Sequence, residues 1–228
     1  MSAYVHTFFF GFYPYICMAV FLIGSMLRYD RDPYSWKADS SQLLRRRGLR
    51  MGSNFFHIGI LFLFFGHLFG LLTPEWVYIE FISPGAKQLV AMVSGGIMGA
   101  MCLFGALVLL RRRLFDPRIR ATSHFSDIAI LLILFAQVVL GLLTIPASAQ
   151  HMDGSSMVLM AEWAQHIVSF RSGAAAFLVG LPLIFKLHLV LGMTIFLIFP
   201  FTRLVHIWSV PVQYLFRSGY QIVRRRNG

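Results

Sequence analysis

Long uncharged runs alternate along this chain with short segments that carry nearly all of its charge. Charged side chains are absent from four runs, residues 7–27, 51–74, 88–110 and 128–150. Each run is close to the roughly 20 apolar residues that an α-helix needs to cross about 30 Å of hydrocarbon. A fifth run, 172–202, is interrupted only by Lys186, and its halves are too short to span separately. The pattern predicts five membrane-spanning helices, over about residues 5–28, 52–73, 87–110, 125–147 and 174–208.

Composition agrees with a membrane-embedded chain. The 228 residues are 57% hydrophobic and 13% charged, whereas about a quarter of a soluble domain is charged. No linker or internal repeat divides the chain, so we expect one all-α domain over residues 1–228, an integral membrane bundle. The first run lacks the basic start and cleavage site of a secretory signal, and we expect it to remain in the mature protein. Cys17 and Cys102 lie inside spans, where we expect small buried hydrophobes.

The basic residues predict the orientation in the membrane. All 20 except Lys87, Arg171 and Lys186 lie in residues 28–50, 111–120 and 203–226. Because Lys and Arg favour cytoplasmic loops, we expect a periplasmic N-terminus and a cytoplasmic C-terminus. The net charge of +11 then reflects topology and docking to acidic partners or lipids. Spread over short membrane loops, it does not indicate binding to nucleic acid.

One outer connection has a distinctive pattern. Residues 156–170, "SMVLMAEWAQHIVSF", repeat Met, Leu, Trp and Phe at helical spacing. A short amphipathic helix on the outer surface and an ordinary ordered loop both agree with this pattern.

Four of the eight histidines lie within spans, His57 and His67 in the second, His188 and His206 in the fifth. Polar side chains in spanning helices are rare and usually mark function. A structural hydrogen bond would account for any one of them, but four on two helices favour ligation. The others lie at span edges or in loops, and we assign no chemistry to them: His6, His124, His151 and His166.

Helix direction pairs the four intramembrane histidines. The second span runs outward and the fifth inward, so His67 should meet His188 near the outer surface and His57 should meet His206 near the inner one. At 1.5 Å per residue, His57 and His67 are about 15 Å apart and His188 and His206 about 27 Å. Eighteen residues make five turns, whereas ten residues miss a whole number of turns by about 80°. Helix tilt or a bend at Pro200 has to absorb this mismatch.

Opposed imidazoles among Phe and Leu fit six-coordinate haem b, which carries electrons because both axial positions are filled. A zinc site needs more converging ligands. A proton pump needs intramembrane Asp or Glu, whereas we expect all nine acidic residues to lie outside the spans. Gly59, Gly66 and Gly70 would admit a flat macrocycle, although glycines also serve ordinary helix packing.

Haem propionates need cationic or hydrogen-bonding partners. Arg203 and the Arg111–Arg113 cluster, with Arg112 at its centre, are candidates for the inner haem, and Lys186 for the outer one. The alternatives are that the arginines only set the topology and that Lys186 snorkels outward.

Four stretches of the chain resemble the gamma, or cytochrome b, subunit of membrane-bound respiratory nitrate reductases. They are "YPYICMAVFLIGSMLRYD", "SNFFHIGILFLFFGHLFGLLTP", "GLLTIPASAQHMDGS" and "KLHLVLGMTIFLIFPFTRLVHIWSVPVQYL". The resemblance keeps their order and covers nearly the whole chain. It implies a multi-pass protein of the bacterial cytoplasmic (inner) membrane with two haem b groups. The distal haem near the periplasm would be held by His67 and His188, and the proximal haem by His57 and His206.

The resemblance also implies an activity and partners. A membrane quinol would be oxidised near the distal haem, on the periplasmic side. Electrons would pass inward to an iron–sulfur beta subunit and then to a molybdenum alpha subunit, which reduces nitrate to nitrite. The family's quinol-site lysine falls on Lys87, which could donate a hydrogen bond to a quinone oxygen, with Gly66 leaving room for the ring. An interfacial anchor is the alternative for Lys87.

Two other functions remain open from the residues alone. A cytochrome b of another quinone-linked complex, such as formate dehydrogenase or hydrogenase, predicts the same haems with different soluble partners. A small transporter or structural anchor predicts no cofactor, but the chain lacks the broken-helix pairs typical of transporters.

Overall fold

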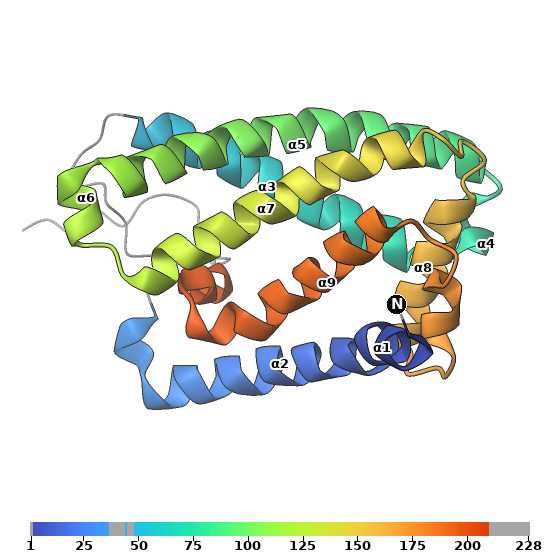
Figure 1. The fold of residues 1–228 in the computed structure, drawn as a ribbon, viewed down its shortest axis with the longest axis horizontal. Coiled ribbons are helices and arrows are strands. Elements are labelled where there is room, and N and C mark those ends of the chain that lie inside the picture. The colour runs from blue at the N-terminus through green and yellow to red at the C-terminus, as the bar shows by residue number, and fades with distance from the viewer. Residues whose placement is uncertain (1, 37–43, 45–47, 210–228) are drawn as a thin grey trace, which may run out of the picture.

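The computed structural model describes residues 2–36, 44 and 48–209, and within them every regular element is a helix or a helical turn (Figure 1). Five helices are long and apolar enough to cross a membrane: Ala3–Arg31, Leu49–Leu72, Pro84–Phe115, Phe125–Ser148 and Leu183–Phe201. The predicted all-α class and the five spans are therefore confirmed. Part of the predicted basic segments lies outside the described residues, namely Lys37, Arg45–Arg47, Arg217 and Arg224–Arg226.

The helices follow one another with short connections. The α-helices are α1 (Ala3–Thr7), α2 (Tyr13–Arg31), α3 (Leu49–Leu72), α4 (Glu75–Tyr78), α5 (Pro84–Phe115), α6 (Pro117–Ala121), α7 (Phe125–Ser148), α8 (Ser155–Val168) and α9 (Leu183–Ile198). A π-helical turn, Phe8–Phe12, joins α1 to α2. The 3₁₀ turns are Pro33–Ser35, Ala174–Leu178, Phe199–Phe201 and Arg203–Ser209.

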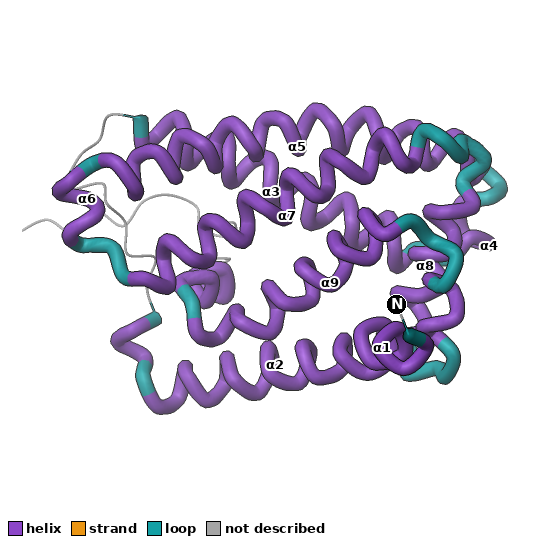
Figure 2. Tube along the Cα trace, in the orientation of Figure 1, coloured by secondary structure: helices purple, strands orange, loops and turns teal. Residues whose placement is uncertain are grey.

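The long helices run side by side along the longest axis of the molecule, with α8 across one end and α6 at the other (Figure 1). The loops gather at these two ends (Figure 2), which we call the α8 end and the α6 end. Helix α3 packs on α5, α5 on α7, α7 on α9, and α9 on α2. Helix α3, which carries His57 and His67, and helix α9, which carries His188, are thus separated in this order by α5 and α7.

Local sequence explains where the spans begin. Helix α5 starts with Pro84, whose missing N–H costs nothing at a first helical position, and the Ser83 hydroxyl accepts from Ala86 N at 3.3 Å. Helix α3 starts after Gly48, whose φ of +73° favours glycine. In the first turn of α7, the Asp127 carboxylate accepts from His124 N at 3.3 Å. Asp127 therefore lies inside the fourth span, and the prediction that all acidic residues lie outside the spans is wrong.

Helices α3 and α5 approach closely because small residues line their contact. A Cβ added at Gly59 would lie 2.7 Å from Cys102 Cβ, and one added at Gly105 would lie 2.8 Å from Gly52 O. Small residues allow such approach between helices in lipid, where van der Waals packing drives association. Cys102 is fully buried here and Cys17 is 1% exposed, which confirms the prediction that both cysteines pack as small hydrophobes.

The fifth span is shorter and more broken than the predicted helix over residues 174–208. Helix α9 begins after Pro182 and ends at Ile198, and a 3₁₀ turn with Pro200 follows. Proline lacks the N–H that a continuing helix needs, and Thr202 is extended, with φ −123° and ψ 175°. The Arg28 guanidinium donates to Pro200 O at 2.6 Å and to Thr202 O at 2.8 Å. Carbonyls that the break exposes are thereby satisfied.

The amphipathic pattern at residues 156–170 does form a helix, α8, which excludes the loop alternative. Its apolar face packs on the first and last spans: Trp163 and Ile167 share a buried cluster with Phe10, Leu178 and other side chains. Trp163 Nε1 donates to Phe10 O at 2.9 Å. Helix α8 therefore closes the bundle at the end where α3 finishes and α9 begins.

The α3–α5 contact yields a matched test. Gly105→Ala places a methyl group against the α3 backbone, whereas Gly95→Ala, on the same helix, meets no atom within 4 Å. We expect Gly105→Ala to destabilise the fold by about 1–3 kcal/mol, the usual cost of overpacking, and Gly95→Ala to be neutral. Thermal unfolding of the purified proteins in detergent measures both. Equal midpoints for the two variants would contradict the close approach of the helices.

Candidate functional site

The four intramembrane histidines form two facing pairs. The ring centres of His57 and His206 are 6.4 Å apart, and those of His67 and His188 are 6.0 Å apart. These are the partners that helix direction predicts. The first pair lies toward the α6 end of the bundle and the second toward the α8 end.

The break at Pro200 is what allows both pairs to form. His57 and His67 share α3, so their side chains differ in direction by about 80°. His188 lies on α9, but His206 lies on the 3₁₀ turn Arg203–Ser209, past the break. The side chains of His188 and His206 therefore need not point in the same direction, as they would on one continuous helix.

Backbone carbonyls fix the orientation of three of the four rings. Nδ1 lies 2.7 Å from Ser53 O in His57, 2.7 Å from Leu63 O in His67 and 2.5 Å from Arg203 O in His206. A carbonyl oxygen only accepts, so each Nδ1 carries the hydrogen and each Nε2 keeps a free lone pair. Metal-ligating histidines are typically held in this way, with the second nitrogen bonded to a carbonyl or carboxylate.

His188 is held differently. Within the part of the chain that the structure describes, its Nδ1 is buried without a hydrogen-bond partner, and its Nε2 lies 3.5 Å from the amide nitrogen of Gln137 on α7. The ring packs on Gly141, where an added Cβ would lie 3.0 Å from His188 Cε1. Sequence reasoning passed over Gln137, although an amide in the middle of an apolar span is itself a signal of function.

The donor set limits what either pair can hold. No group of three or more His, Cys, Asp or Glu side chains that could hold a metal ion occurs in the described part of the chain. Two imidazoles are too few for a structural zinc site. A metal bound between them must therefore bring its other ligands as part of a cofactor. A porphyrin iron brings four nitrogens of its own and takes two axial ligands. Two metal–nitrogen bonds of about 2 Å and two half-rings of about 1 Å put ring centres about 6 Å apart, so both pairs fit haem.

Charged side chains surround the α6-end pair. Asp127, 3% exposed, lies 3.1 Å from Arg113 Nη1 and 3.8 Å from Arg203 Nη1. Arg203 also supplies the carbonyl that orients His206. Arg112 lies near the start of α3, since a Cβ at Gly48 would be 3.8 Å from its Cδ.

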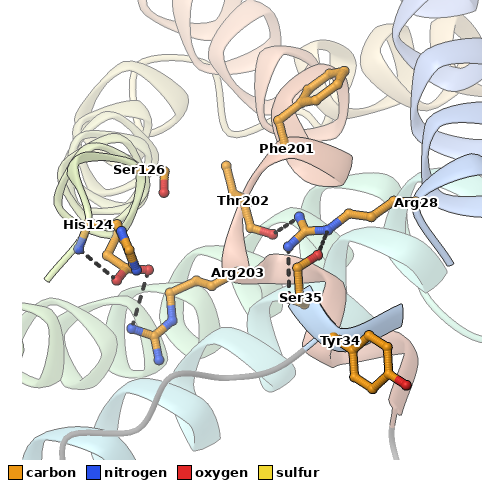
Figure 3. Close-up of a pocket in the computed structure, with 9 residues that line it drawn as sticks. Arg28, Tyr34, Ser35, His124, Ser126, Phe201, Thr202 and Arg203 are labelled. Carbon is orange, nitrogen blue, oxygen red and sulfur yellow. Dashed lines mark hydrogen bonds and ion pairs between the residues drawn. The ribbon is translucent and has the colours of Figure 1, made fainter. Parts of the chain in front are cut away.

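A cavity of about 400 Å³ opens beside this cluster (Figure 3). In Figure 3, Arg28 reaches toward Ser35 and Thr202, and Arg203 bonds to the carboxylate beside His124. The cavity is lined by Arg28, Tyr34, Ser35, His124, Ser126, Asp127, Phe201, Thr202 and Arg203. Sequence reasoning missed Arg28 and Asp127, because nothing in their spacing shows that they meet the fifth span.

Lys87 and Gly66 lie toward the α8 end. Lys87 Nζ donates to Gly70 O at 3.2 Å and sits 3.6 Å above the centre of the Tyr78 ring, a cation–π contact. Burial raises the pKa of the Tyr78 hydroxyl, and the carboxylates of Glu75 and Glu162 raise it further, so Tyr78 stays neutral well above pH 7. A Cβ added at Gly66, the residue before His67, would lie within 4 Å of no other described atom apart from its chain neighbours and its own helix backbone.

Lys186, the remaining predicted site residue, does not join this group. Its Nζ donates to Val179 O at 2.8 Å. The contact agrees with the snorkelling alternative, in which the ammonium group reaches the polar edge of the bundle.

Comparison with known proteins points to one family. The model of the nitrate reductase gamma subunit family matches residues 6–226. The chain is 58% identical over 224 residues to the respiratory nitrate reductase 1 gamma chain of Escherichia coli, covering 98% of this chain and 99% of the relative. It is 58% identical over 226 residues to the respiratory nitrate reductase 2 gamma chain of the same organism, covering 99% and 100%. The nitrate reductase gamma chain of Bacillus subtilis is 39% identical over 221 residues, covering 95% and 97%.

The buried charge cluster gives a stability prediction. Asp127→Asn keeps an oxygen that can cap α7 but removes the charge between Arg113 and Arg203. Breaking a buried ion pair from one side costs about 3–5 kcal/mol, and the partial exposure of Arg203, 21%, places our expectation near the lower end. Thermal unfolding in detergent measures the loss. Asp153→Asn, in an exposed turn, is the control, and equal midpoints for both variants would show that the cluster does not stabilise the fold.

Proposed function

The chain belongs to the nitrate reductase gamma subunit family, and from that premise we propose that it is the dihaem cytochrome b membrane anchor of a respiratory nitrate reductase. The single observation that carries the proposal is the pair of facing imidazoles near each end of the bundle, at 6.4 Å and 6.0 Å. Nitrate reduction itself belongs to a partner subunit. This chain's own activity is to oxidise quinol and deliver electrons.

His57 and His206 hold the proximal haem b in this proposal, and His67 and His188 hold the distal one. Haem b with two axial imidazoles supplies one-electron transfer, because no iron position is open to oxygen. The carbonyl bonds to Nδ1 keep His57, His67 and His206 in the tautomer that can ligate. Arg203 and Arg112 at the α6 end are the proposed propionate partners, whereas the ammonium group of Lys186 is bonded to Val179 O.

The charge distribution supports a direction across the membrane. Among the described residues, the α6 end carries most of the arginines, including Arg28, Arg50, Arg113 and Arg203, whereas Lys87 lies at the α8 end. Because basic loops favour the cytoplasm, the α6 end is cytoplasmic and the α8 end, with the N-terminus, is periplasmic. Electrons then enter at the α8 end and leave at the α6 end, in the bacterial inner membrane.

Lys87 is the proposed quinol-binding residue. Its ammonium group rests on the Tyr78 ring and on Gly70 O, so it is held at the membrane edge where a lipid-soluble quinol arrives. It can donate a hydrogen bond to a quinone oxygen, while the open space at Gly66 admits the ring beside His67. Protons from the quinol are then released outside while electrons travel inward, which builds membrane potential.

The α6 end is the proposed docking face for the soluble partners, an iron–sulfur beta subunit and a molybdenum alpha subunit. The relatives named above are all called nitrate reductase gamma chains. This favours nitrate reductase over the formate dehydrogenase and hydrogenase alternatives. The transporter and anchor alternatives do not account for the two imidazole pairs.

Variants of single histidines test the haem sites. We expect His67→Ala or His188→Ala to remove only the distal haem and His57→Ala or His206→Ala only the proximal one, because each pair serves one iron. Reduced-minus-oxidised spectra of the purified complex count the b-type haems, and addition of nitrate should reoxidise both in the parent complex. His151→Ala, in the connection after α7, is the control and should retain both haems. Equal loss of both haems in any ligand variant would contradict the pairing, and absence of b-type bands in the parent would end the proposal.

Lys87→Met tests the quinol site. A hydrogen bond to a charged group contributes about 1.5–3 kcal/mol, so we expect quinol oxidation to fall roughly 10- to 100-fold with both haems retained. Stopped-flow reduction of the haems by quinol measures the rate. Arg171→Gln removes another cation from the α8 end and should leave the rate unchanged. If both variants slow the reaction equally, general surface charge, and not a specific contact at Lys87, controls it.

A further inference from the structure

The four ligand histidines are not equivalent, and the exception is His188. Backbone carbonyls accept from Nδ1 of His57, His67 and His206. Nδ1 of His188 is buried and has no hydrogen-bond partner among the described residues. A buried polar atom without a partner is uncommon and costs about 1–3 kcal/mol. The site therefore needs a fourth acceptor that the backbone of α9 does not provide.

Gln137 on α7 is the polar side chain at this position. Its Nε2 donates to His188 O at 3.1 Å and lies 3.5 Å from His188 Nε2. Small residues make room for it: a Cβ added at Gly192 would lie 3.1 Å from Gln137 Nε2, and Gly141, one turn further along α7, faces the His188 ring. The contact between α7 and α9 is thus built around an amide and an imidazole in the apolar layer.

The two side chains also have complementary unsatisfied atoms. Over residues 2–36, 44 and 48–209, neither Gln137 Oε1 nor His188 Nδ1 finds a hydrogen-bond partner, and both atoms are buried. An amide oxygen is an acceptor, and the Nδ1–H of an imidazole that ligates through Nε2 is a donor. The structure places Gln137 Nε2 beside His188 Nε2, so pairing Oε1 with Nδ1 requires both side chains to rotate about their own bonds while the helix backbones stay in place.

We infer that Gln137 is a positioning residue for His188, its amide oxygen being the partner of the ring nitrogen that does not bind iron. The amide oxygen would accept the Nδ1 hydrogen bond of His188, as backbone carbonyls do for the other three rings. The inference rests on the proposed distal haem. It goes further in assigning to one side chain on α7 both the orientation of the ligand and part of the control over the distal haem's potential.

An acceptor on the second nitrogen makes an imidazole a more basic ligand, and a more basic ligand favours oxidised iron. Removing the acceptor should raise the midpoint potential of the distal haem, and replacing it with a carboxylate should lower it. The proximal haem, held by His57 and His206, should not respond. Backbone carbonyls hold the other three rings, with the Ser53 hydroxyl also 3.2 Å from His57 Nδ1. At the distal haem, Gln137 is therefore the partner that substitution can change.

The experiment is a potentiometric titration of both haems, followed by difference spectra, in membranes that contain the full complex. We expect Gln137→Met to shift the distal potential upward and Gln137→Glu to shift it downward. Each shift should change the oxidised-to-reduced ratio about threefold or more, where tenfold corresponds to about 59 mV for one electron. Thr144→Val is the control, because Thr144 bonds to Gly141 O on the same helix and should leave both potentials unchanged.

The pattern of outcomes decides the inference. Opposite shifts of the distal potential in the two Gln137 variants support it. Loss of the distal haem in Gln137→Met, with retention and a downward shift in Gln137→Glu, also supports it. Shifts in the same direction, no shift in either, or loss of the distal haem from both would overturn it. A parent complex without haem would instead refute the proposed function.

Discussion

An imidazole inside the membrane can form hydrogen bonds only with other groups of the protein, and the arrangement of the bundle depends on this constraint. In hydrocarbon a polar group must find its hydrogen-bond partner within the protein. Three of the intramembrane histidines bond Nδ1 to carbonyls of their own segments, and Nε2 is left facing a ring on another span. One interaction thereby satisfies a polar group within the spanning segment and prepares the ligand. Each pair supplies two nitrogen ligands at a spacing that suits the iron of a haem.

The rest of the structure serves to bring those rings face to face. Tight packing of Gly52 and Gly59 against α5 fixes the first half of α3. The break at Pro200 frees His206 from the helical direction of His188, and Arg28 holds the broken segment by its carbonyls. At the same end Asp127 binds two arginines, one of them on the segment that carries His206. Loss of regular helix at this point is therefore part of the construction of the site.

Much of this arrangement could be predicted from the sequence, for physical reasons. A helix that crosses lipid needs a long uncharged run, so the five spans can be predicted from the sequence. The antiparallel direction of the second and fifth spans then determines which histidines can face each other. Proline and local hydrogen bonding decide the remainder, and these depend on contacts between distant segments. The sequence therefore predicts a fifth span that is too long. It also does not show that Asp127, which the predicted span over residues 125–147 includes, pairs with two arginines. Gln137 was overlooked because its importance lies in what stands opposite it.

The proposed ligation by both imidazole pairs is tested most directly by the haem content of the purified full-length chain with its partner subunits. The account predicts two haem b groups per chain, both low-spin, with axial imidazoles from the protein on each iron. A preparation of folded, assembled complex with no haem or one haem, or with a five-coordinate high-spin iron, would contradict it.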